Sequence, residues 1–360
     1  MKYTHTIINN AVTNPYIDFI NRNFNPDEHR FYVIRGWSQE LIKTSESGNV
    51  IGITGIKNII SGFRLLKDLS TSEKVFIHGL FTPYLVAMLF FQPWLLKKCS
   101  WVIWGGDLYD YVEERTTLIS KMIEYMRAKV ICKMGSIITL IKGDYEFARK
   151  WYKVKGIREN AYYPFSIKIQ SIDAILEKNP VHQAYNNQPT NIIIGNSSST
   201  TNRHFEIFNL LKKFQNENIK IHALLAYGDP VYAEKVCEEG RLLFGEKFIS
   251  VTDYMTYEKF IQFLNNMDIL IFNHERQQGL GNLFLALLLK KKVYINHTST
   301  LFDCFRNDLK LQVEKTSDIG KSNFYDFMTI DDTIATRNKQ LITEILDEDE
   351  VVKHWKALFN

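Results

Sequence analysis

Short hydrophobic runs alternate with amphipathic segments through most of the chain, a rhythm typical of βαβ units that build parallel sheets. In the first half it predicts strands at His29–Ile34, Lys74–His78, Trp101–Trp104 and Ser136–Ile141, and helices at Tyr84–Leu96 and Asp144–Tyr152. Glycines at positions 52, 55 and 62 weaken the prediction of a continuous helix over residues 51–67.

The alternation stops over residues 167–190, which end in a polar run of Asn, Gln and Pro and are predicted to link two domains. It then resumes, with strands predicted at Asn191–Gly195, Ile219–Ala226, Phe248–Val251, Asp268–Phe272 and Val293–Asn296. Helices are predicted at Arg203–Phe214, Ala233–Phe244, Tyr257–Asn266, Asn282–Leu289 and Val351–Leu358. We therefore expect α/β domains over residues 1–166 and 191–340 and a helical segment over 341–360. Ligands of such sheets bind beyond the carboxyl ends of the strands, so the loops after strands are the candidates for a site.

Composition narrows the class of protein. The chain has 360 residues, 45% hydrophobic and 23% charged, which fits two globular domains and excludes a disordered tail, a collagen or a low-complexity array. Its four cysteines are Cys99, Cys132, Cys237 and Cys304. They form no CxxC pair, so we expect neither a zinc ribbon nor a thioredoxin-like site. So few cysteines also argue against a disulfide-stapled secreted domain, and we expect the protein in the reducing cytosol.

No signal peptide is expected, because residues 1–16 have no apolar core followed by a cleavage site. The stretch most like a membrane segment, Tyr84–Leu96, is too short to span a bilayer and is interrupted by Gln92 and Pro93. We interpret it as a buried helix, with a helix at the bilayer surface as the alternative.

Charge is distributed unevenly. Residues 1–166 carry a net charge of +7 and the remainder −3. A basic front half suits an anionic partner such as a phospholipid surface or a phosphate-bearing substrate, although an ordinary solvated surface is the alternative. The basic residues are scattered among acids rather than arranged in a stripe, which argues against nucleic acid.

The strongest local feature is HERQQGLGN at residues 274–282, between a hydrophobic strand and an apolar helix. Gly279 and Gly281 let the backbone approach a ligand, the helix N-terminus offers free N–H groups to phosphate, and Arg276 can add a bidentate contact. Phe284 replaces the third glycine of a dinucleotide fingerprint, and the second histidine of a zinc peptidase is missing, so neither a nicotinamide cofactor nor that metal site is predicted.

A second candidate loop, GNSSSTTN at residues 195–202, also lies between a strand and a helix. Its hydroxyl and amide side chains can cap that helix or hold a diphosphate. It lacks a Walker lysine, which argues against an ATP-driven motor.

Two turns in the basic half hold titratable side chains. Asp107, in WVIWGGDLY (101–109), is either a general base or a capping residue in the turn. His78, in FIHGLFTP (76–83), is either catalytic or structural. The only DxD, at residues 347–349, lies in an acidic terminal run rather than at a strand end, so no essential metal is predicted.

Together these motifs resemble the bacterial TDP-N-acetylfucosamine:lipid II N-acetylfucosaminyltransferases, glycosyltransferase family 56. The matching segments, in the same order and at similar spacing, are VFIHGLFTPYL, WVIWGGDLYDY, IKGDYEF, IIIGNSSSTTNRH and ERQQGLGNLFLALL. The combination of IWGGDLY and RQQGLG is the specific part. The resemblance covers most of the chain and is weak in the linker and the C-terminal segment.

The resemblance implies a GT-B architecture, two facing Rossmann-like domains with an interdomain cleft. The acceptor would bind residues 1–166 and the nucleotide sugar residues 191–340. The donor residues implied are Gly195, Asn196, Ser197, Arg276, Gln277, Gln278, Gly279, Gly281 and Asn282. On the acceptor side, the resemblance implies Trp104, Gly106 and Tyr109, with Asp107 and His78 as the catalytic candidates.

The implied reaction moves N-acetylfucosamine, a deoxyamino sugar, from a TDP-sugar to a saccharide on undecaprenyl diphosphate. It would serve enterobacterial common antigen or an O-antigen-like lipopolysaccharide, without cofactor or metal, by peripheral contact with the anionic cytoplasmic face of the inner membrane. Many GT-B enzymes carry glutamates where Gln278 and Ala286 stand, so amides of Gln277 and Gln278 would replace those contacts.

Arg276 and two helix N-termini would stabilise the leaving diphosphate. Asp107 is the preferred base for an inverting reaction and His78 the second choice, whereas a retaining reaction needs no such base. Three alternatives remain: a GDP- or UDP-sugar donor, a non-catalytic protein that binds nucleotide or glycan, and a nucleotide-sugar epimerase, for which no second acid–base pair is found.

Overall fold

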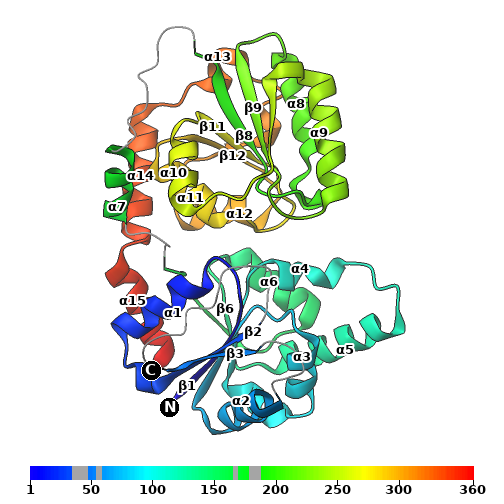
Figure 1. Cartoon of the computed structure of the whole chain (residues 1–360), viewed down its shortest axis with the longest axis vertical. Helices are drawn as coiled ribbons and strands as arrows, with labels where there is room; N and C mark the ends of the chain where they lie inside the picture. Colours follow the sequence, from blue (N-terminus) through cyan, green and yellow to red (C-terminus); the bar gives the residue numbers. More distant parts are fainter. Residues whose placement is uncertain (35–47, 54–58, 165–168, 178–187) are drawn as a thin grey trace. The chain divides into compact units, whose positions relative to one another are not determined.

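The computed structural model describes the chain except for residues 35–47, 54–58, 165–168 and 178–187. The chain divides into two compact units, one formed by residues 1–166 and 346–360 and the other by residues 167–345. Each unit consists of a parallel sheet with helices on both faces (Figure 1). No described helix is long and apolar enough to cross a membrane.

The sheet of the first unit has seven strands in the order β3-β2-β1-β4-β5-β6-β7. They are β1 Tyr3–Ile8, β2 His29–Ile34, β3 Val50–Ile53, β4 Lys74–His78, β5 Cys99–Val102, β6 Ser136–Ile138 and β7 Ile157–Glu159. The strand order reverses between β1 and β4, and in such sheets a ligand crevice forms beyond the carboxyl ends at that switch point.

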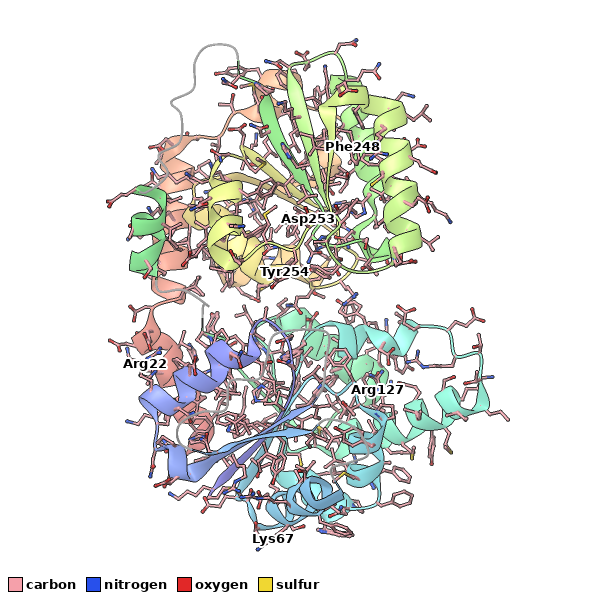
Figure 2. The ribbon with its side chains drawn as sticks, in the orientation of Figure 1. Arg22, Lys67, Arg127, Phe248, Asp253 and Tyr254 are labelled. Carbon is pink, nitrogen blue, oxygen red and sulfur yellow. The ribbon has the colours of Figure 1, made fainter. Side chains whose placement is uncertain are left out.

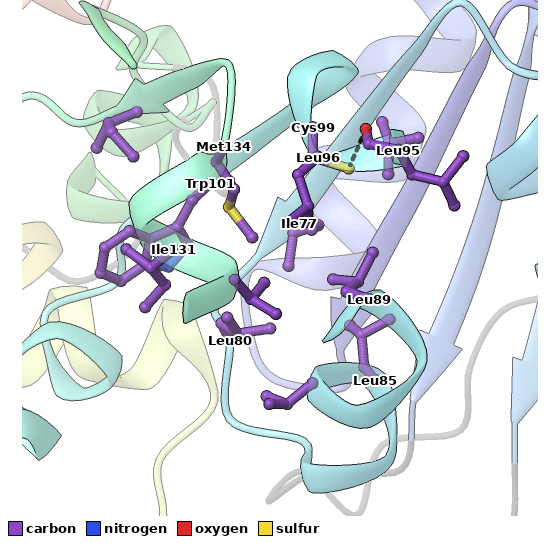
Figure 3. Packing of buried hydrophobic residues seen from close by; sticks show 14 of the residues in the cluster. Ile77, Leu80, Leu85, Leu89, Leu95, Leu96, Cys99, Trp101, Ile131 and Met134 are labelled. Atoms are coloured by element: carbon purple, nitrogen blue, oxygen red, sulfur yellow. Dashed lines mark hydrogen bonds between the residues drawn. The ribbon is translucent and has the colours of Figure 1, made fainter. Parts of the chain in front are cut away.

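Hydrophobic side chains alternate between the two faces of this sheet, as the pleat of a strand requires. Phe76 packs with helices α1 (Thr13–Asn23) and α15 (Glu348–Phe359). Its neighbours Val75 and Ile77 pack with α2 (Ile59–Thr71), α3 (Pro83–Phe90), α5 (Leu118–Lys133) and α6 (Lys142–Tyr152). Figure 3 shows part of this second layer, where Leu85 and Leu89 of α3 and Ile131 of α5 lie in the same cluster as the indole of Trp101.

The second unit repeats the pattern with six strands in the order β10-β9-β8-β11-β12-β13. They are β8 Thr190–Ile194, β9 Ile219–Leu224, β10 Phe248–Val251, β11 Ile269–Phe272, β12 Lys292–Ile295 and β13 Glu314–Lys315. Its switch point lies between β8 and β11, so the two loops singled out from the sequence, 195–202 and 274–282, leave the sheet on either side of it.

Helices α8 (His204–Leu211), α9 (Pro230–Phe244) and α13 (Phe324–Met328) share one hydrophobic cluster on this sheet. On the other face lie α10 (Tyr257–Asn265) and α11 (Leu280–Leu288), as Figure 1 shows. Helix α14 (Asp332–Ile345) packs against α11, and α7 (Ile169–Glu177) packs against α10. A one-turn helix, α12 (Thr300–Asp303), follows β12.

The structure differs from the sequence prediction in several elements. The predicted helix Tyr84–Leu96 is two pieces, because α3 ends at Phe90 and Pro93 begins a 3-10 helix, Pro93–Lys98. The predicted linker 167–190 contains α7, while residues 178–187 lie outside the described part of the chain. The predicted segment 341–360 contains the end of α14 and all of α15.

Helix α15 completes the first unit, although it lies at the opposite end of the sequence from β1. The Tyr3 hydroxyl donates to the carbonyl of Phe359 at 2.6 Å, and the Trp355 indole donates to the carbonyl of Tyr162 at 2.8 Å. The Lys74 ammonium donates to the carbonyl of Leu358 at 2.8 Å. These contacts explain why the last residues belong with the N-terminal sheet rather than forming a separate segment.

Candidate functional site

The loop after β8 is tightly folded on itself. Gly195 has φ +62°, and a Cβ there would lie 2.4 Å from His204 Nε2, so only glycine fits. The amide of Asn196 donates to Asn202 Oδ1 at 2.8 Å, and Asn202 Nδ2 donates to Ser197 Oγ at 3.1 Å. The side chains of the loop therefore bind one another and not the start of α8, whose N-cap residue is Arg203.

The loop after β11 meets the loop after β8. Gly279 has φ +67°, and a Cβ there would lie 3.1 Å from Asn196 Nδ2 and 2.9 Å from a ring carbon of Phe272. Gln278 Nε2 donates to Thr201 Oγ1 at 3.2 Å. The two motifs predicted to bind the donor are thus brought together at the switch point of the second sheet.

The N-terminus of α11 is open. Its N-cap residue is Gly279, with no side-chain cap, and nothing lies within 4 Å of a Cβ built on Gly281. The first amides of the helix keep their N–H groups available, and the helix dipole adds partial positive charge there. Beside them, Asn196 is buried with its Oδ1 atom unpartnered, while its Nδ2 donates to the Tyr227 hydroxyl at 3.0 Å. The uncapped helix end is suited to bind phosphate oxygens. Asn196 Oδ1 is an acceptor, so it is suited to a ligand group that donates a hydrogen bond, such as a hydroxyl.

Arg276 acts electrostatically on this loop. Burial lowers the pKa of His274 to about 3, the hydrogen bond to the Gln278 carbonyl opposes this, and the charges of His204 and then Arg276 lower it further. His274 is therefore neutral at pH 7, and its Nδ1 lies 3.3 Å from that carbonyl. A neutral, buried histidine orders the loop, while the partly exposed Arg276 supplies its positive charge.

Two tyrosines that the sequence analysis missed lie at the same edge of the sheet. Tyr227 follows β9 and is 56% exposed, and Tyr254 follows β10 and is 69% exposed. Figure 2 labels Tyr254 in the loop after β10. Desolvation raises the pKa of the Tyr227 hydroxyl, Tyr254 raises it further, and Arg276 opposes both. Exposed rings beside an anion site can stack against a planar base. Their position directly after two strands was the available signal.

Asp107 lies at the carboxyl end of the first sheet but is fully buried. Its Oδ2 accepts from the Trp101 indole at 2.6 Å and from the Leu80 amide at 3.2 Å, and its Oδ1 accepts from the Trp104 amide at 3.0 Å. Burial raises its pKa, and these hydrogen bonds oppose the rise. Asp107 thus ties together the loops after β4 and β5, which is a positioning role.

We expect Asp107→Asn to lower the free energy of unfolding by about 2–4 kcal/mol, since an amide N–H₂ would replace an oxygen that accepts hydrogen bonds in a buried site. Urea denaturation measures this, with the exposed Asp18→Asn in the same unit as the matched control. Unchanged stability together with lost sugar transfer would instead assign Asp107 to proton transfer.

His78 is also fully buried, within a chain of hydrogen-bonded rings. Its Nδ1 is bonded to the Tyr163 hydroxyl, and its Nε2 lies 3.3 Å from His5 Nδ1. His5 Nε2 in turn lies 3.1 Å from His29 Nδ1. Burial lowers the pKa of His78 to about 3, so it is neutral at pH 7, and its hydrogen bond to the partly exposed Tyr163 links it to the sheet edge.

The predicted acceptor residues lie around these two groups. The Trp104 indole donates to the Tyr163 hydroxyl at 2.7 Å, Gly106 begins the one-turn helix α4 (Gly106–Tyr109), and the Tyr109 hydroxyl donates to Asp144 Oδ1 at 3.3 Å. Trp104 and Tyr109 are both partly exposed. The structure thus gathers Trp104, Tyr109 and the IKGDYEF motif at one edge of the first sheet.

A cavity of about 320 Å³ opens next to the loop after β4. Leu80, Phe81 and Pro83 line one side, and Arg115 and Arg127 line the other. Both arginines are paired with Asp110 and Glu124, at N–O distances from 2.8 to 3.2 Å. This ion-pair network fixes the entry into α5, on which Figure 2 labels Arg127.

Comparison with known families decides the assignment. A family model described as 4-alpha-L-fucosyltransferase, glycosyl transferase group 56, matches residues 9–342. The chain belongs to this family. It is therefore a glycosyltransferase, and every candidate residue described above lies inside the matched range of family 56.

Solved structures agree on the GT-B fold. A glycosyltransferase from Rickettsia africae superposes with a TM-score of 0.65 at 12% identity, covering 99% of this chain and 98% of that one. HepE from Anabaena, solved in complex with UDP, has a TM-score of 0.69 at 9% identity and 99% coverage of both chains. WaaG, involved in lipopolysaccharide biosynthesis, has a TM-score of 0.61 at 9% identity, covering 99% of this chain and 98% of that one.

This family 56 chain departs from the wider GT-B pattern at two positions. Ala286 is fully buried in α11, and Gln278 is hydrogen-bonded to Thr201. Among the described residues, no group of three or more His, Cys, Asp or Glu side chains is arranged to hold a metal ion.

Proposed function

We propose that the protein transfers N-acetylfucosamine from a TDP-sugar to a saccharide carried on undecaprenyl diphosphate, in bacterial surface-polysaccharide synthesis. Family membership supports the reaction class. The observation that carries the donor site is the uncapped N-terminus of α11 with Gly281 open beside it, in the same loop as Arg276.

In this proposal the second unit binds the donor. The diphosphate accepts hydrogen bonds from the first amides of α11, and Arg276 balances the charge that develops on it as the sugar bond breaks. The base stacks against Tyr227 and Tyr254, whose exposed rings lie at the same edge of the sheet. Gly195, Ser197, Gln277 and Asn282 complete the loops around it. We propose that charge stabilisation by these groups replaces a metal, and that no cofactor takes part.

The acceptor binds the first unit in this proposal, beside Trp104, Gly106 and Tyr109. Asp107 and His78 hold the loops that present Trp104 and Tyr163, because both are buried and already hydrogen-bonded. The lipid carrier implies peripheral contact with the cytoplasmic face of the inner membrane.

A thermal-shift titration tests the donor site. A nucleoside diphosphate at a hundredfold excess over its dissociation constant is expected to stabilise the protein by about 2.7 kcal/mol. We expect TDP to shift the unfolding midpoint more than UDP or GDP, with the same shift in EDTA. In Gly281→Leu the shift should vanish while the unliganded midpoint stays the same, because the new side chain enters open space.

The other outcomes are equally informative. Preference for UDP or GDP would keep the transferase and change the donor, and a shift lost in EDTA would contradict metal independence. If no nucleotide shifts the midpoint, the donor site at residues 276–281 is refuted, and a non-catalytic glycan-binding protein becomes the better proposal.

A further inference from the structure

Helix α5 carries an exposed hydrophobic face. Leu118 is 84% exposed, Ile119 68%, Met122 55% and Tyr125 59%. At 3.6 residues per turn these four positions lie on one side of the helix. So much exposed apolar area, concentrated on one face of one helix, marks an interaction surface rather than scattered surface residues.

The opposite face of α5 makes the contacts that hold the helix. Val130 and Ile131 are buried in the core, and Arg127 pairs with Glu124 at 2.9 Å. A capping box between Thr117 and Ser120 begins the helix. The cap and the buried contacts fix α5 as a regular helix. Its exposed apolar side chains are therefore held in a fixed arrangement.

The exposed face continues onto the segment after α3. The Tyr125 ring lies 6.4 Å from that of Phe90, and Phe90 lies 5.4 Å from Phe91. Phe91 is 72% exposed, and Trp94 is 69% exposed. We call the six exposed residues together the α5 surface: Leu118, Ile119, Met122, Tyr125, Phe91 and Trp94.

The exposed charges within the two segments that carry the α5 surface are of one sign, whereas Glu113 and Glu114, exposed just before α5, are acidic. Within residues 84–99 and 117–133 the exposed charged side chains are Lys97, Lys121, Lys129 and Lys133. The Lys129 ammonium lies 5.3 Å from the centre of the Tyr125 ring. Glu124 is the one acidic residue in these two ranges, and its carboxylate is turned inward onto arginines.

We propose that the α5 surface docks on an anionic lipid bilayer. A helix with an apolar face flanked by lysines lies in the plane of a membrane interface, where Trp and Tyr rings are also favoured. The lysines match the negative charge of the lipid headgroups. The inner side of the same helix, at Ser120, Ile123 and Arg127, lines the cavity of about 320 Å³. Docking would bring this cavity, which lies in the unit proposed to bind the acceptor, close to the membrane in which the lipid-linked acceptor lies. This inference therefore rests on the proposed function.

Vesicle flotation of the whole protein tests this proposal without donor or acceptor. The protein is expected to float with vesicles of phosphatidylglycerol and phosphatidylethanolamine, and much less with phosphatidylcholine alone. The triple variant Leu118→Ser, Ile119→Ser, Met122→Ser should bind at least about tenfold more weakly, because three exposed apolar side chains no longer enter the interface. The matched control is Val231→Ser with Leu242→Ser on α9, which are 57% and 79% exposed and should bind as the parent does.

Two results would overturn the proposal. One is equal flotation of the parent and the triple variant. The other is a parent that sediments as a dimer and a triple variant that sediments as a monomer, with no difference in flotation, which would assign the surface to a second copy. The TDP-induced thermal shift should be the same in the triple variant and the parent, so failure of docking and failure of the donor site are told apart.

Discussion

Replacing Arg276 with alanine is expected to lower the rate of sugar transfer by about a hundredfold to a thousandfold and to leave the unfolding midpoint unchanged. The guanidinium lies in the loop that meets the uncapped start of α11, where the diphosphate gains charge as its bond to the sugar breaks. Arg276 is partly exposed, so its removal opens no cavity in the core. Release of nucleoside diphosphate from the TDP-sugar, in the presence of lipid-linked acceptor, measures the rate.

The matched control is Arg241→Ala, an exposed arginine in the last turn of α9 in the same unit, which should transfer at the parent rate. Arg276→Lys should give an intermediate rate, because an ammonium keeps the charge but loses the two-pronged geometry of the guanidinium. If Arg276→Ala transfers within about threefold of the parent, stabilisation of the leaving group cannot be assigned to this residue.

The second large effect is loss of stability in mild acid. Burial lowers the pKa of His78 and His274 to about 3 and of His29 and His204 to about 4. In the unfolded chain these histidines titrate near their ordinary value of 6.5. Below that pH the unfolded state binds more protons than the folded state, so stability falls as pH falls from about 6.5 toward the folded pKa values.

At pH 5 each of these histidines lowers the free energy of unfolding by about 2 kcal/mol relative to its value at neutral pH. Two belong to each unit, and a folded domain has a margin of only about 5–15 kcal/mol. The unfolding midpoint should therefore fall steeply between pH 7 and pH 5, and unfolding at pH 5.5 should take up protons in calorimetry. A midpoint that stays flat over this range would show that the buried histidines are already protonated or become hydrated.

Hydrophobic patterning predicted the strands that frame the two switch points, because parallel strands buried on both faces are nearly continuous apolar runs. Strand β1 was missed: Thr4, His5 and Thr6 are polar by type, yet all three are buried. Helix α5 was missed because its apolar residues face outward on its first turns. Prediction from hydrophobic periodicity takes apolar residues to be buried, so it does not identify a helix whose apolar residues are exposed.

The donor loops were predictable because the glycines and small polar residues that they need are adjacent in sequence. The acceptor edge was harder. Asp107 and His78 were singled out as titratable groups, but their burial depends on Trp101, Tyr163 and His5, which meet them only in the folded sheet. Tyr227 and Tyr254 belong to two different loops, and only the strand order brings them to the same edge.

The position of helix α15 in the sequence determines which unit can complete its folding first during translation. The aromatic face formed by Tyr16 and Phe76 is covered by Trp355 and Phe359, which the ribosome makes after the second unit. The second unit is built from one continuous stretch of sequence and has all its parts earlier. The N-terminal unit therefore keeps a hydrophobic face uncovered until the whole second unit has been translated.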